Sequence, residues 1–361
     1  MPLTEGEQRL AVAGEHAPDL LLAVAVEVGV DADLAGDRPR DGLVVLGPVV
    51  LLLAHAPSVD GGGTDATRAI YAASMSTRTF GAQSMVAPLR DVLVKRPAEA
   101  FGRAFDDPAT GYLHAVDLAA AQAQHDQMTE LLRGLGATVH ELEAEHDPDL
   151  TYTFDPVLVT DRGVVPLRPG KPNRQGEEAL IERWCNENGI PTLGRIEEPG
   201  TAEGGDSFWL DERTLCVGRS LRTNREGVRQ LQAILEPEVE VEVFDVPYFK
   251  GNDDLVHLMS VISPVADDLA VVYLPLLPVG LWELLNERGI RMVEVPDEEF
   301  PTLGCNVLAV SPNVVVFAAG NPVTERRMQE AGVEVHTFPA SEVGVNGSGG
   351  PTCLTRPILR G

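Results

Sequence analysis

Five polar residues recur at nearly equal intervals along the chain, and their types could together do chemistry on one small molecule. They are Asp155, Asp206, His257, Asn306 and Cys353, at successive intervals of 51, 51, 49 and 47 residues. A thiol can act as a nucleophile, an imidazole can carry a proton, and carboxylates can bind a cation. If one structural unit repeats at this interval, the five residues occupy equivalent places and meet at one site.

Cys353 and His257 are the predicted nucleophile and acid/base. Cys353 follows the glycine-rich run Ser348-Gly349-Gly350-Pro351-Thr352, whose bare backbone allows a ligand to approach closely. A structural buried thiol is the alternative for a lone cysteine, but its place in the repeat favours a functional one. A thiol needs a nearby base or cation to ionise near neutral pH. His257, the only histidine at a repeat position, is therefore its expected partner.

Three acidic residues are expected to complete the site. Glu203 opens the motif Glu203-Gly204-Gly205-Asp206, which no helix follows directly, so the motif is not a phosphate-binding loop. We expect Glu203 to orient and charge the imidazole; the alternative is a solvated acid in a tight turn. Asp155 is expected to receive the N–H groups of a planar cation, although it could equally be a turn acid that begins a strand. Asp206, at a repeat position, is assigned to substrate binding.

Two arginines are candidates for binding a ligand carboxylate. Arg174 and Arg222 each lie between a predicted hairpin and the helix that follows it. Arginines at a helix entrance are usually solvated. Two of them at comparable positions beside one pocket could instead hold a carboxylate, because each guanidinium group offers parallel N–H donors. Both are therefore included among the predicted substrate-binding residues.

The elements that must position these residues repeat as well. Four segments are typical of two apolar strands joined by a turn. They are Asp155–Leu167 around Asp161-Arg162-Gly163, Asp206–Val217 around Asp211-Glu212, His257–Tyr273 around Ser263-Pro264, and Asn306–Ala318 around Ser311-Pro312-Asn313. An amphipathic helix follows each hairpin, at about 177–188, 225–235, 279–288 and 324–331. Gly189, Gly289 and Gly332 end three of these helices before another strand, so the repeating unit is ββαβ.

An incomplete copy of the unit precedes these four. It consists of a strand at 91–96, a helix at 117–135 and a strand at 138–142. The last strand, at 353–359, has no hairpin mate, and the strand at 91–96 is unpaired as well. Pairing these two strands closes five units into a ring and removes exposed sheet edges. The sequence therefore predicts an α/β fold with fivefold pseudo-symmetry.

Composition excludes several classes of function. The chain has 28 Lys+Arg against 55 Asp+Glu and a formal net charge of −27, which disfavours nucleic acids and anionic membranes and favours cationic ligands. The longest apolar run, residues 42–54, is too short to cross a bilayer. The four cysteines contain no C-x-x-C pair, which indicates reduced thiols in the cytoplasm and no zinc site.

The first 74 residues differ from the rest. They contain no Lys, Asn, Phe, Trp or Cys, and their apolar runs keep neither a helical nor a strand period for long. Met75, followed by Ser-Thr-Arg-Thr-Phe-Gly, is typical of a second start. We therefore expect residues 1–74 to be an extension that is unstructured or not part of the functional protein, and residues 75–361 to form a single catalytic domain.

Three motifs resemble a known superfamily. Glu203-Gly204-Gly205-Asp206, His257-Leu258 and the glycine-rich run into Cys353 are similar, in this order and spacing, to the signature of the guanidine-modifying enzymes. These include arginine deiminases, amidinotransferases and dimethylarginine dimethylaminohydrolases. The similarity spans about residues 80–360 and implies a five-bladed α/β propeller of ββαβ units.

The resemblance also implies residue roles. Cys353 would be the nucleophile, His257 the general acid/base and Glu203 its carboxylate partner. Asp155 would anchor the substrate guanidinium. The pair Arg174 and Arg222 would hold an amino-acid carboxylate. Such a reaction needs no metal or organic cofactor.

One position favours a particular substrate within the superfamily. Arginine deiminases and amidinotransferases carry His-x-Asp at the catalytic histidine, whereas Met259 stands at the place of that Asp. A thioether leaves the N–H groups of an unsubstituted guanidinium unpaired, at a cost of about 1 to 3 kcal/mol, and a dimethylated nitrogen has none to lose. The expected reaction is therefore hydrolysis of dimethylarginine to citrulline and dimethylamine through a Cys thiouronium adduct.

Several alternatives stay open at this point. On the same fold they are an arginine deiminase, an arginine-to-ornithine hydrolase and an amidinotransferase. A noncatalytic guanidine-binding module is the alternative from a different class. The expected partner is in each case a small cationic guanidino compound, with no nucleic acid or membrane. Assembly as a homo-oligomer is also open.

Overall fold

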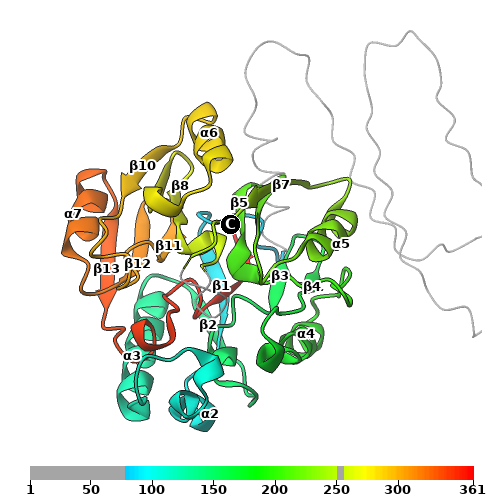
Figure 1. Ribbon diagram of the computed structural model, residues 1–361, viewed down its shortest axis with the longest axis horizontal. Coiled ribbons are helices and arrows are strands. Elements are labelled where there is room, and N and C mark those ends of the chain that lie inside the picture. Colours follow the sequence, from blue (N-terminus) through cyan, green and yellow to red (C-terminus); the bar gives the residue numbers. More distant parts are fainter. Residues whose placement is uncertain (1–77, 250–255) are drawn as a thin grey trace, which may run out of the picture. The chain divides into compact units, whose positions relative to one another are not determined.

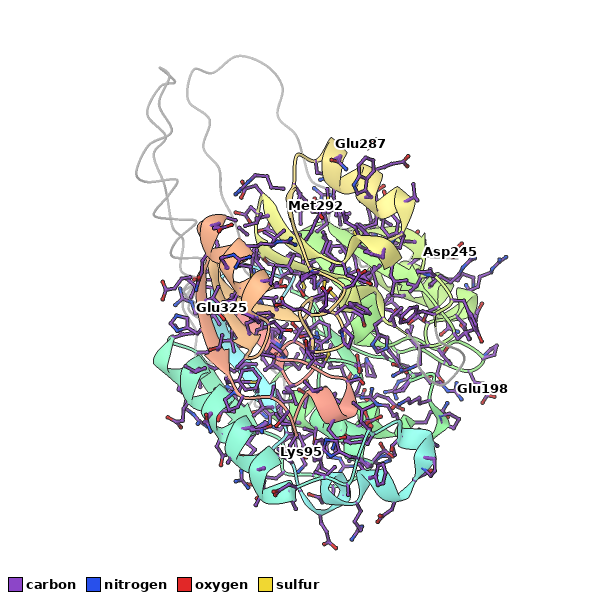
Figure 2. The ribbon with its side chains drawn as sticks, turned by 60° about the vertical axis from the view of Figure 1, so that its left-hand side comes forward. Lys95, Glu198, Asp245, Glu287, Met292 and Glu325 are labelled. Atoms are coloured by element: carbon purple, nitrogen blue, oxygen red, sulfur yellow. The ribbon has the colours of Figure 1, made fainter. Side chains whose placement is uncertain are left out.

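The computed structural model describes residues 78–249 and 256–361, all within the unit Ala73–Gly361 (Figure 1). The extension expected at residues 1–74 lies outside the described residues. In the described ranges, no helix is both long and apolar enough to cross a membrane. Acidic side chains such as Glu198, Asp245 and Glu287 are exposed on the outer surface of this part (Figure 2).

The strands of the described residues form five small sheets, and none of these closes into a barrel by itself. Four sheets have three strands and one has two. In sheet order they are β14 (Arg356–Arg360), β1 (Leu89–Val94) and β2 (Thr138–Glu141); β3 (Val157–Val159) and β4 (Val164–Pro166); β5 (Ser207–Asp211), β6 (Thr214–Arg219) and β7 (Glu240–Asp245); β10 (Arg291–Glu294), β9 (Leu269–Val272) and β8 (Ile262–Ala266); β11 (Val307–Ser311), β12 (Val314–Ala318) and β13 (Glu334–Phe338).

The helices lie at the outside of the described part, and strands β1, β5, β8 and β11 lie nearer its middle (Figure 1). The helices are α2 (Glu99–Gly102), α3 (Leu118–Gly134), α4 (Glu177–Glu187), α5 (Arg225–Leu235), α6 (Val279–Glu287) and α7 (Pro322–Glu330). The glycines predicted to end three of them, Gly189, Gly289 and Gly332, all have positive φ, as this type of cap requires. The expected α/β class and helix positions are therefore confirmed.

Helix α6 buries an apolar stripe against its sheet. On α6, Leu281 and Leu285 are four residues apart and both buried, and they pack with β9 residues such as Val271 in one core cluster. Burial of each such side chain stabilises the fold by about 1.5 to 3 kcal/mol. The loops at the ends of the strands are thereby held in fixed places.

The predicted pairing of the last strand with the first is confirmed. β14 runs antiparallel to β1, with Leu89 opposite Arg360 and Leu93 opposite Arg356. β1 also pairs in parallel with β2. The C-terminal strand therefore completes the first sheet and anchors the turn that precedes it, which contains Cys353.

The predicted turn of the third hairpin is wrong, although its two strands are present. Ser263 and Pro264 lie inside β8, and the chain turns at residues 267–268. The Ser263 hydroxyl donates to the Cys305 carbonyl and accepts from the Val307 N–H, so it links β8 to β11. Pro264 is tolerated because it lies beside a register shift, where a missing N–H costs little.

The unit that begins at Asp155 lacks its predicted third strand. After α4 the chain makes a single bridge, between Val164 and Thr192, so this sheet keeps two strands. Pro191 interrupts the segment at that point and has no N–H to give to a ladder. The segment before β1 is tied to β14: the Gly81 N–H donates to the Ile358 carbonyl, and the Gly81 carbonyl accepts from the Arg360 N–H.

Candidate active site

Three of the five repeat-position residues line one cavity. Asp155, His257 and Cys353 do so although about a hundred residues separate each from the next. Asp155 precedes β3, His257 caps the short 3-10 helix η6 (Leu258–Ser260), and Cys353 lies in the turn before β14. The cavity has a volume of about 90 Å³. Its other lining residues are Thr110, Gly111, Asp149, Tyr152, Lys171, Arg174, Arg222, Ser260, Gly347, Ser348 and Gly349.

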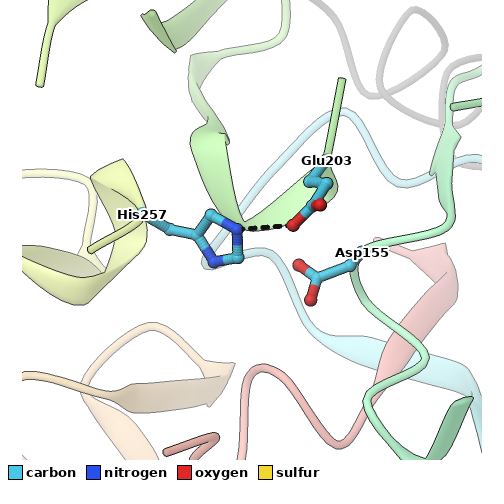
Figure 3. Close-up of side chains that lie close together, drawn as sticks. All are labelled: Asp155, Glu203 and His257. Atoms are coloured by element: carbon cyan, nitrogen blue, oxygen red, sulfur yellow. Dashed lines mark hydrogen bonds and ion pairs between the residues drawn. The ribbon is translucent and has the colours of Figure 1, made fainter. Parts of the chain in front are cut away.

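Glu203 holds the imidazole of His257. Its Oε2 lies 2.7 Å from His257 Nε2 (Figure 3), and its Oε1 accepts from Arg222 Nε at 2.8 Å. Burial raises the pKa of Glu203, but the Arg222 charge and the His257 hydrogen bond outweigh it and hold the pKa well below its ordinary value. Glu203 is therefore an anion that can stabilise a protonated imidazole.

The same surroundings act on His257. Burial and the charge of Arg222 lower its pKa, whereas the carboxylates of Asp155, Asp206 and Glu203 raise it, and the net result is a raised pKa. A histidine in this state keeps its proton longer than a solvated one as the pH rises. It is suited to giving a proton to a leaving group.

Asp155 lies beside this pair (Figure 3). Its Oδ2 accepts from Arg174 Nη1 at 2.7 Å, and its Oδ1 accepts from the Gly205 N–H at 2.8 Å. Burial raises the pKa of Asp155, but Arg174 and His257 overcome this and leave the pKa below its ordinary value. A Cβ on Gly205 would collide with the His257 ring and with Asp155, so glycine is required where the backbone passes between the two.

Cys353 receives a hydrogen bond from the fourth repeat-position residue. Asn306 Nδ2 lies 3.1 Å from Cys353 Sγ, and its Oδ1 accepts from the Thr352 N–H at 3.0 Å. Burial, and next the charge of Asp155, raise the pKa of Cys353 to about 11, while the Asn306 hydrogen bond lowers it. The equal spacing had marked Asn306 without giving it a role, and its contact with the thiol supplies one.

The two predicted carboxylate-binding arginines contact protein carboxylates in this structure. Arg174 is 2% exposed and bonds both to Asp155 and to Glu177. Arg222 bonds to Glu203 through Nε and Nη2. Burial raises the pKa of Glu177 to about 8, even though Arg174 lowers it. Both arginines line the cavity, but their capture of a ligand carboxylate stays a prediction.

Asp206 does not line the cavity. It is fully buried, and its Oδ1 accepts from the Leu258 N–H at 3.0 Å while its Oδ2 accepts from the Ser220 hydroxyl at 2.7 Å. Burial raises its pKa. Its contact with the residue after His257 makes it a positioning group for η6.

Met259 does not face the cavity, which removes the structural basis of the substrate preference drawn from it. Its side chain belongs to the apolar core cluster around β8 and β9, and Ser260 lines the cavity instead. The chain after His257 forms a 3-10 turn, so its side chains do not alternate between two faces as they would in a strand.

Several cavity residues carried no signal in the repeat. Asp149 and Tyr152 come from the 3-10 helix η3 (Pro148–Thr151) and its end, and Lys171 precedes another short turn. These connections vary from unit to unit, so an equal spacing does not mark them. Lys171 lies three residues before the predicted substrate-binding residue Arg174, which is the sequence feature nearest to it.

Ligand atoms of Asp155, Glu203 and His257 lie within 4.8 Å of one another, a composition that can hold a metal ion. Arg174 bonds to Asp155 and Arg222 bonds to Glu203. Two guanidinium cations beside the carboxylates oppose a divalent cation electrostatically. The group is better suited to a proton and an organic cation than to a metal.

Comparison with known proteins gives a consistent result. A family model named arginine deiminase matches residues 144–281 and 276–360. The N(G),N(G)-dimethylarginine dimethylaminohydrolase of Pseudomonas aeruginosa is 28% identical over 268 residues, which cover 74% of this chain and 98% of that protein. The arginine deiminase of Listeria welshimeri is 30% identical over 258 residues, which cover 59% of this chain and 62% of the deiminase.

Solved structures share the fold. A mutant dimethylarginine dimethylaminohydrolase from Pseudomonas aeruginosa, complexed with citrulline, superposes with a TM-score of 0.64 and 26% identity, covering 76% of this chain and all of that one. The N-terminal domain of ArgZ, a cyanobacterial arginine dihydrolase, superposes with a TM-score of 0.66 and 22% identity, covering 75% and 97%. The chain belongs to the arginine deiminase family, and with it to the guanidine-modifying superfamily that its motifs resemble.

Proposed function

We propose that this chain is an amidine hydrolase that cleaves a C–N bond of a guanidino substrate through a covalent adduct on Cys353. The observation that carries the proposal is the shared cavity of Cys353, His257 and Asp155, with Glu203 bonded to the imidazole. The relatives named dimethylarginine dimethylaminohydrolase and arginine deiminase support the same reaction type.

The first step is attack on the guanidinium carbon. This carbon is a poor electrophile because the cation is stabilised by resonance, so a covalent nucleophile helps. Asp155 already binds one guanidinium group, that of Arg174, and its remaining lone pairs can hold the substrate cation. A cation placed beside Cys353 lowers the pKa of the thiol from about 11 and so favours the thiolate that attacks.

The second step is loss of the amine and then hydrolysis. His257 donates its proton to the departing nitrogen, the C–N bond breaks, and an S-alkylthiouronium remains on Cys353. His257 then takes a proton from water, and the resulting hydroxide adds to the same carbon. The C–S bond breaks to return the thiolate, and the hydroxyl proton passes to solvent as the oxygen becomes the carbonyl of the product. Glu203 stabilises the charged imidazole throughout.

We propose dimethylarginine as the first substrate to test, with citrulline and dimethylamine as products. The two dimethylarginine dimethylaminohydrolases at 28% and 29% identity support this choice, whereas Met259 no longer does. Incubation with dimethylarginine and with arginine, followed by assay of dimethylamine, ammonia, citrulline and ornithine, decides between this reaction and an arginine deiminase or arginine-to-ornithine hydrolase. Ammonia release from arginine at the higher kcat/KM contradicts the choice of substrate but not the chemistry.

Two further measurements distinguish the proposed hydrolase from an amidinotransferase and from a noncatalytic guanidine-binding module. An amidinotransferase would transfer the amidino group to an added acceptor amine at the expense of citrulline. A noncatalytic guanidine-binding module would bind the substrate without turnover. In the hydrolase we propose, His257→Gly can neither protonate a departing amine nor activate water. With an analogue whose thiolate leaving group needs no proton, such as S-methyl-L-thiocitrulline, this variant should accumulate the thiouronium adduct, and its added mass on the Cys353 peptide is the direct test.

We further propose that the five sheets act as the five blades of an α/β propeller and that residues 75–361 are the catalytic domain. The β14–β1 pairing supports closure of the ring. The negative charge and the absence of a C-x-x-C pair support a cytoplasmic enzyme that acts on a small cation. Intact mass of the native protein tests whether residues 1–74 are retained, and a protease-resistant form that keeps them contradicts the proposed boundary.

A further inference from the structure

Lys171 lines the same cavity as Cys353 and stands between two oxygens there. Its Nζ lies 3.4 Å from Asp149 Oδ2 and 3.1 Å from the carbonyl oxygen of Thr110. The side chain of Asp149 is 5% exposed and that of Lys171 is 22% exposed. An ammonium group of the protein is therefore held against a nearly buried carboxylate inside the cavity.

The two arginines that line the cavity each form an ion pair with a carboxylate of the protein. Arg174 bonds to Asp155. Arg222 bonds to Glu203, behind the cavity wall. Among the lining residues that the structure describes, Asp149 is the only carboxylate besides Asp155. A ligand whose guanidinium is bound at Asp155 and which carries a second cation must therefore bring that cation to Asp149, where Lys171 competes with it.

We propose that Lys171 is a specificity-determining residue that selects against an α-amino group and so extends the substrate class to guanidino carboxylates without one. This inference rests on the proposed function. An α-ammonium must displace Lys171 from Asp149 or lie next to a like charge, and either is unfavourable. A substrate that lacks the amino group leaves the Lys171–Asp149 pair intact and presents its carboxylate to Lys171, which has three N–H donors.

Displacement of Lys171 also disturbs the chain segment over the cavity. Thr110 ends the 3-10 helix η2 (Pro108–Thr110), and a few residues later the N–H groups of Leu113 and His114 both donate to Asn346 Oδ1. Asn346 is fully buried just before the glycine-rich run into Cys353. Lys171 therefore connects Asp149 to a segment that is fixed to the Cys353 loop, and release of its ammonium loosens this connection.

The test compares dimethylarginine with the same molecule in which hydrogen replaces the α-amino group. Both release dimethylamine, so one assay measures kcat/KM for both. We expect the unmodified enzyme to use the des-amino compound at least as well as dimethylarginine. In Lys171→Met, the ratio of kcat/KM for dimethylarginine to that for the des-amino compound should rise by about tenfold or more. The α-ammonium of dimethylarginine no longer competes with Lys171 for Asp149, and the carboxylate of the des-amino compound loses its contact with the Lys171 ammonium. Lys171→Arg keeps the charge and should keep the original preference.

Lys95 supplies a matched control. It follows the last residue of β1 and is labelled in Figure 2. Its Nζ contacts the carboxylate of Glu145 and the carbonyl oxygen of Arg96, but Lys95 does not line the cavity. Lys95→Met should leave the ratio unchanged. An unmodified enzyme with a higher kcat/KM for dimethylarginine than for the des-amino compound, or a Lys171→Met ratio equal to that of Lys95→Met, overturns the inference. Absence of dimethylamine from both compounds instead contradicts the proposed dimethylarginine activity on which the inference rests, so the two failures are distinguishable.

Discussion

Cys353 and Cys305 are two thiols of one chain with different surroundings. Cys305 is 1% exposed in the apolar cluster of β8, β9, β11 and β12, where its Sγ lies 3.6 Å from the Val271 carbonyl oxygen. Burial raises its pKa far above the ordinary value. Burial also raises the pKa of Cys353, but only to about 11, because the Asn306 amide donates to the sulfur. Polar neighbours therefore distinguish the thiol of the proposed nucleophile from a thiol of the apolar core.

The surroundings of Cys305 and those of Cys353 adjoin at the peptide bond between Cys305 and Asn306. Asn306 follows Cys305 directly, and its side chain reaches Cys353 while that of Cys305 enters the core. Adjacent residues at a strand entrance point to opposite sides. The boundary between the apolar core and the polar cavity therefore runs between two consecutive residues.

The largest expected effect separates the two thiols directly. Cys353→Ser should lower kcat for dimethylamine release by about 1,000-fold or more, because a hydroxyl is a far weaker nucleophile than a thiolate. Its melting temperature should stay close to that of the unmodified protein. Cys305→Ser should keep kcat but lower the free energy of unfolding by about 1 to 3 kcal/mol, since it places a hydroxyl in an apolar core. A Cys353→Ser variant that keeps most of its activity contradicts the covalent mechanism.

The second largest effect is expected at Glu203 and tests whether its carboxylate supports proton transfer by His257. Glu203→Gln should lower kcat by about 100-fold, because it removes the anion that favours protonated His257. The pKa of His257 should fall as well, since its hydrogen bond with Glu203 raises that pKa, and the pH profile of kcat should shift toward acid.

Glu299 is the matched control for this change. It is a buried acid that accepts from the N–H groups of Val323 and Thr324 at the start of α7, away from the cavity. Glu299→Gln should lower stability without changing kcat or its pH profile. Equal kinetic losses in both variants would mean that Glu203 acts only through the fold.

A smaller effect is expected from substitution of Asn306, which lies between the apolar core around Cys305 and the cavity that Cys353 lines. Asn306→Leu removes the donor to Cys353, so the thiol pKa should rise and the rate of alkylation by iodoacetamide at neutral pH should fall by about tenfold. Asn321→Leu is the control, because Asn321 is also buried and bonds to the carbonyls of Thr302 and Ala318 far from the thiol. An unchanged alkylation rate in Asn306→Leu would show that the amide only shapes the turn.

The parts of this site that the sequence predicted are those governed by the repeat. The equal spacing predicted that Asp155, His257 and Cys353 share one site, and all three line one cavity. The unpaired strand near Asp91 predicted the β1–β14 pairing. Both predictions follow from the repeat of the ββαβ unit, because residues at equivalent positions in equivalent units have similar surroundings.

The parts that the sequence missed lie in the connections. Glu177 and Asp149 hold Arg174 and Lys171, and these contacts depend on turns that differ from unit to unit. Met259 was placed wrongly for a related reason, since a 3-10 turn rather than a strand follows His257. Long side chains on irregular backbone have no period from which their partners can be predicted.

The smallest expected effect concerns Asp155 and the pH dependence of Cys353. Alkylation requires the thiolate, so in the free enzyme its rate should rise with pH up to the thiol pKa of about 11. Asp155 is the second largest cause of that raised pKa, after burial, and Arg174 opposes it. Asp155→Asn removes the anion and one of the two ion pairs of Arg174, which keeps its pair with Glu177, and both changes favour the thiolate.

Asp155→Asn should therefore increase the alkylation rate of Cys353 at neutral pH by a factor of about 2 to 5, even though turnover is lost with the guanidinium anchor. Mass analysis of the Cys353 and Cys305 peptides after limited alkylation measures both thiols in one sample. Cys305 should stay unmodified in either protein, because its pKa depends on burial and not on the cavity charges. A rate at Cys353 that falls in Asp155→Asn would mean that Asp155 does not act on the thiol electrostatically, and the contrast between the two thiols would then reduce to their access to solvent.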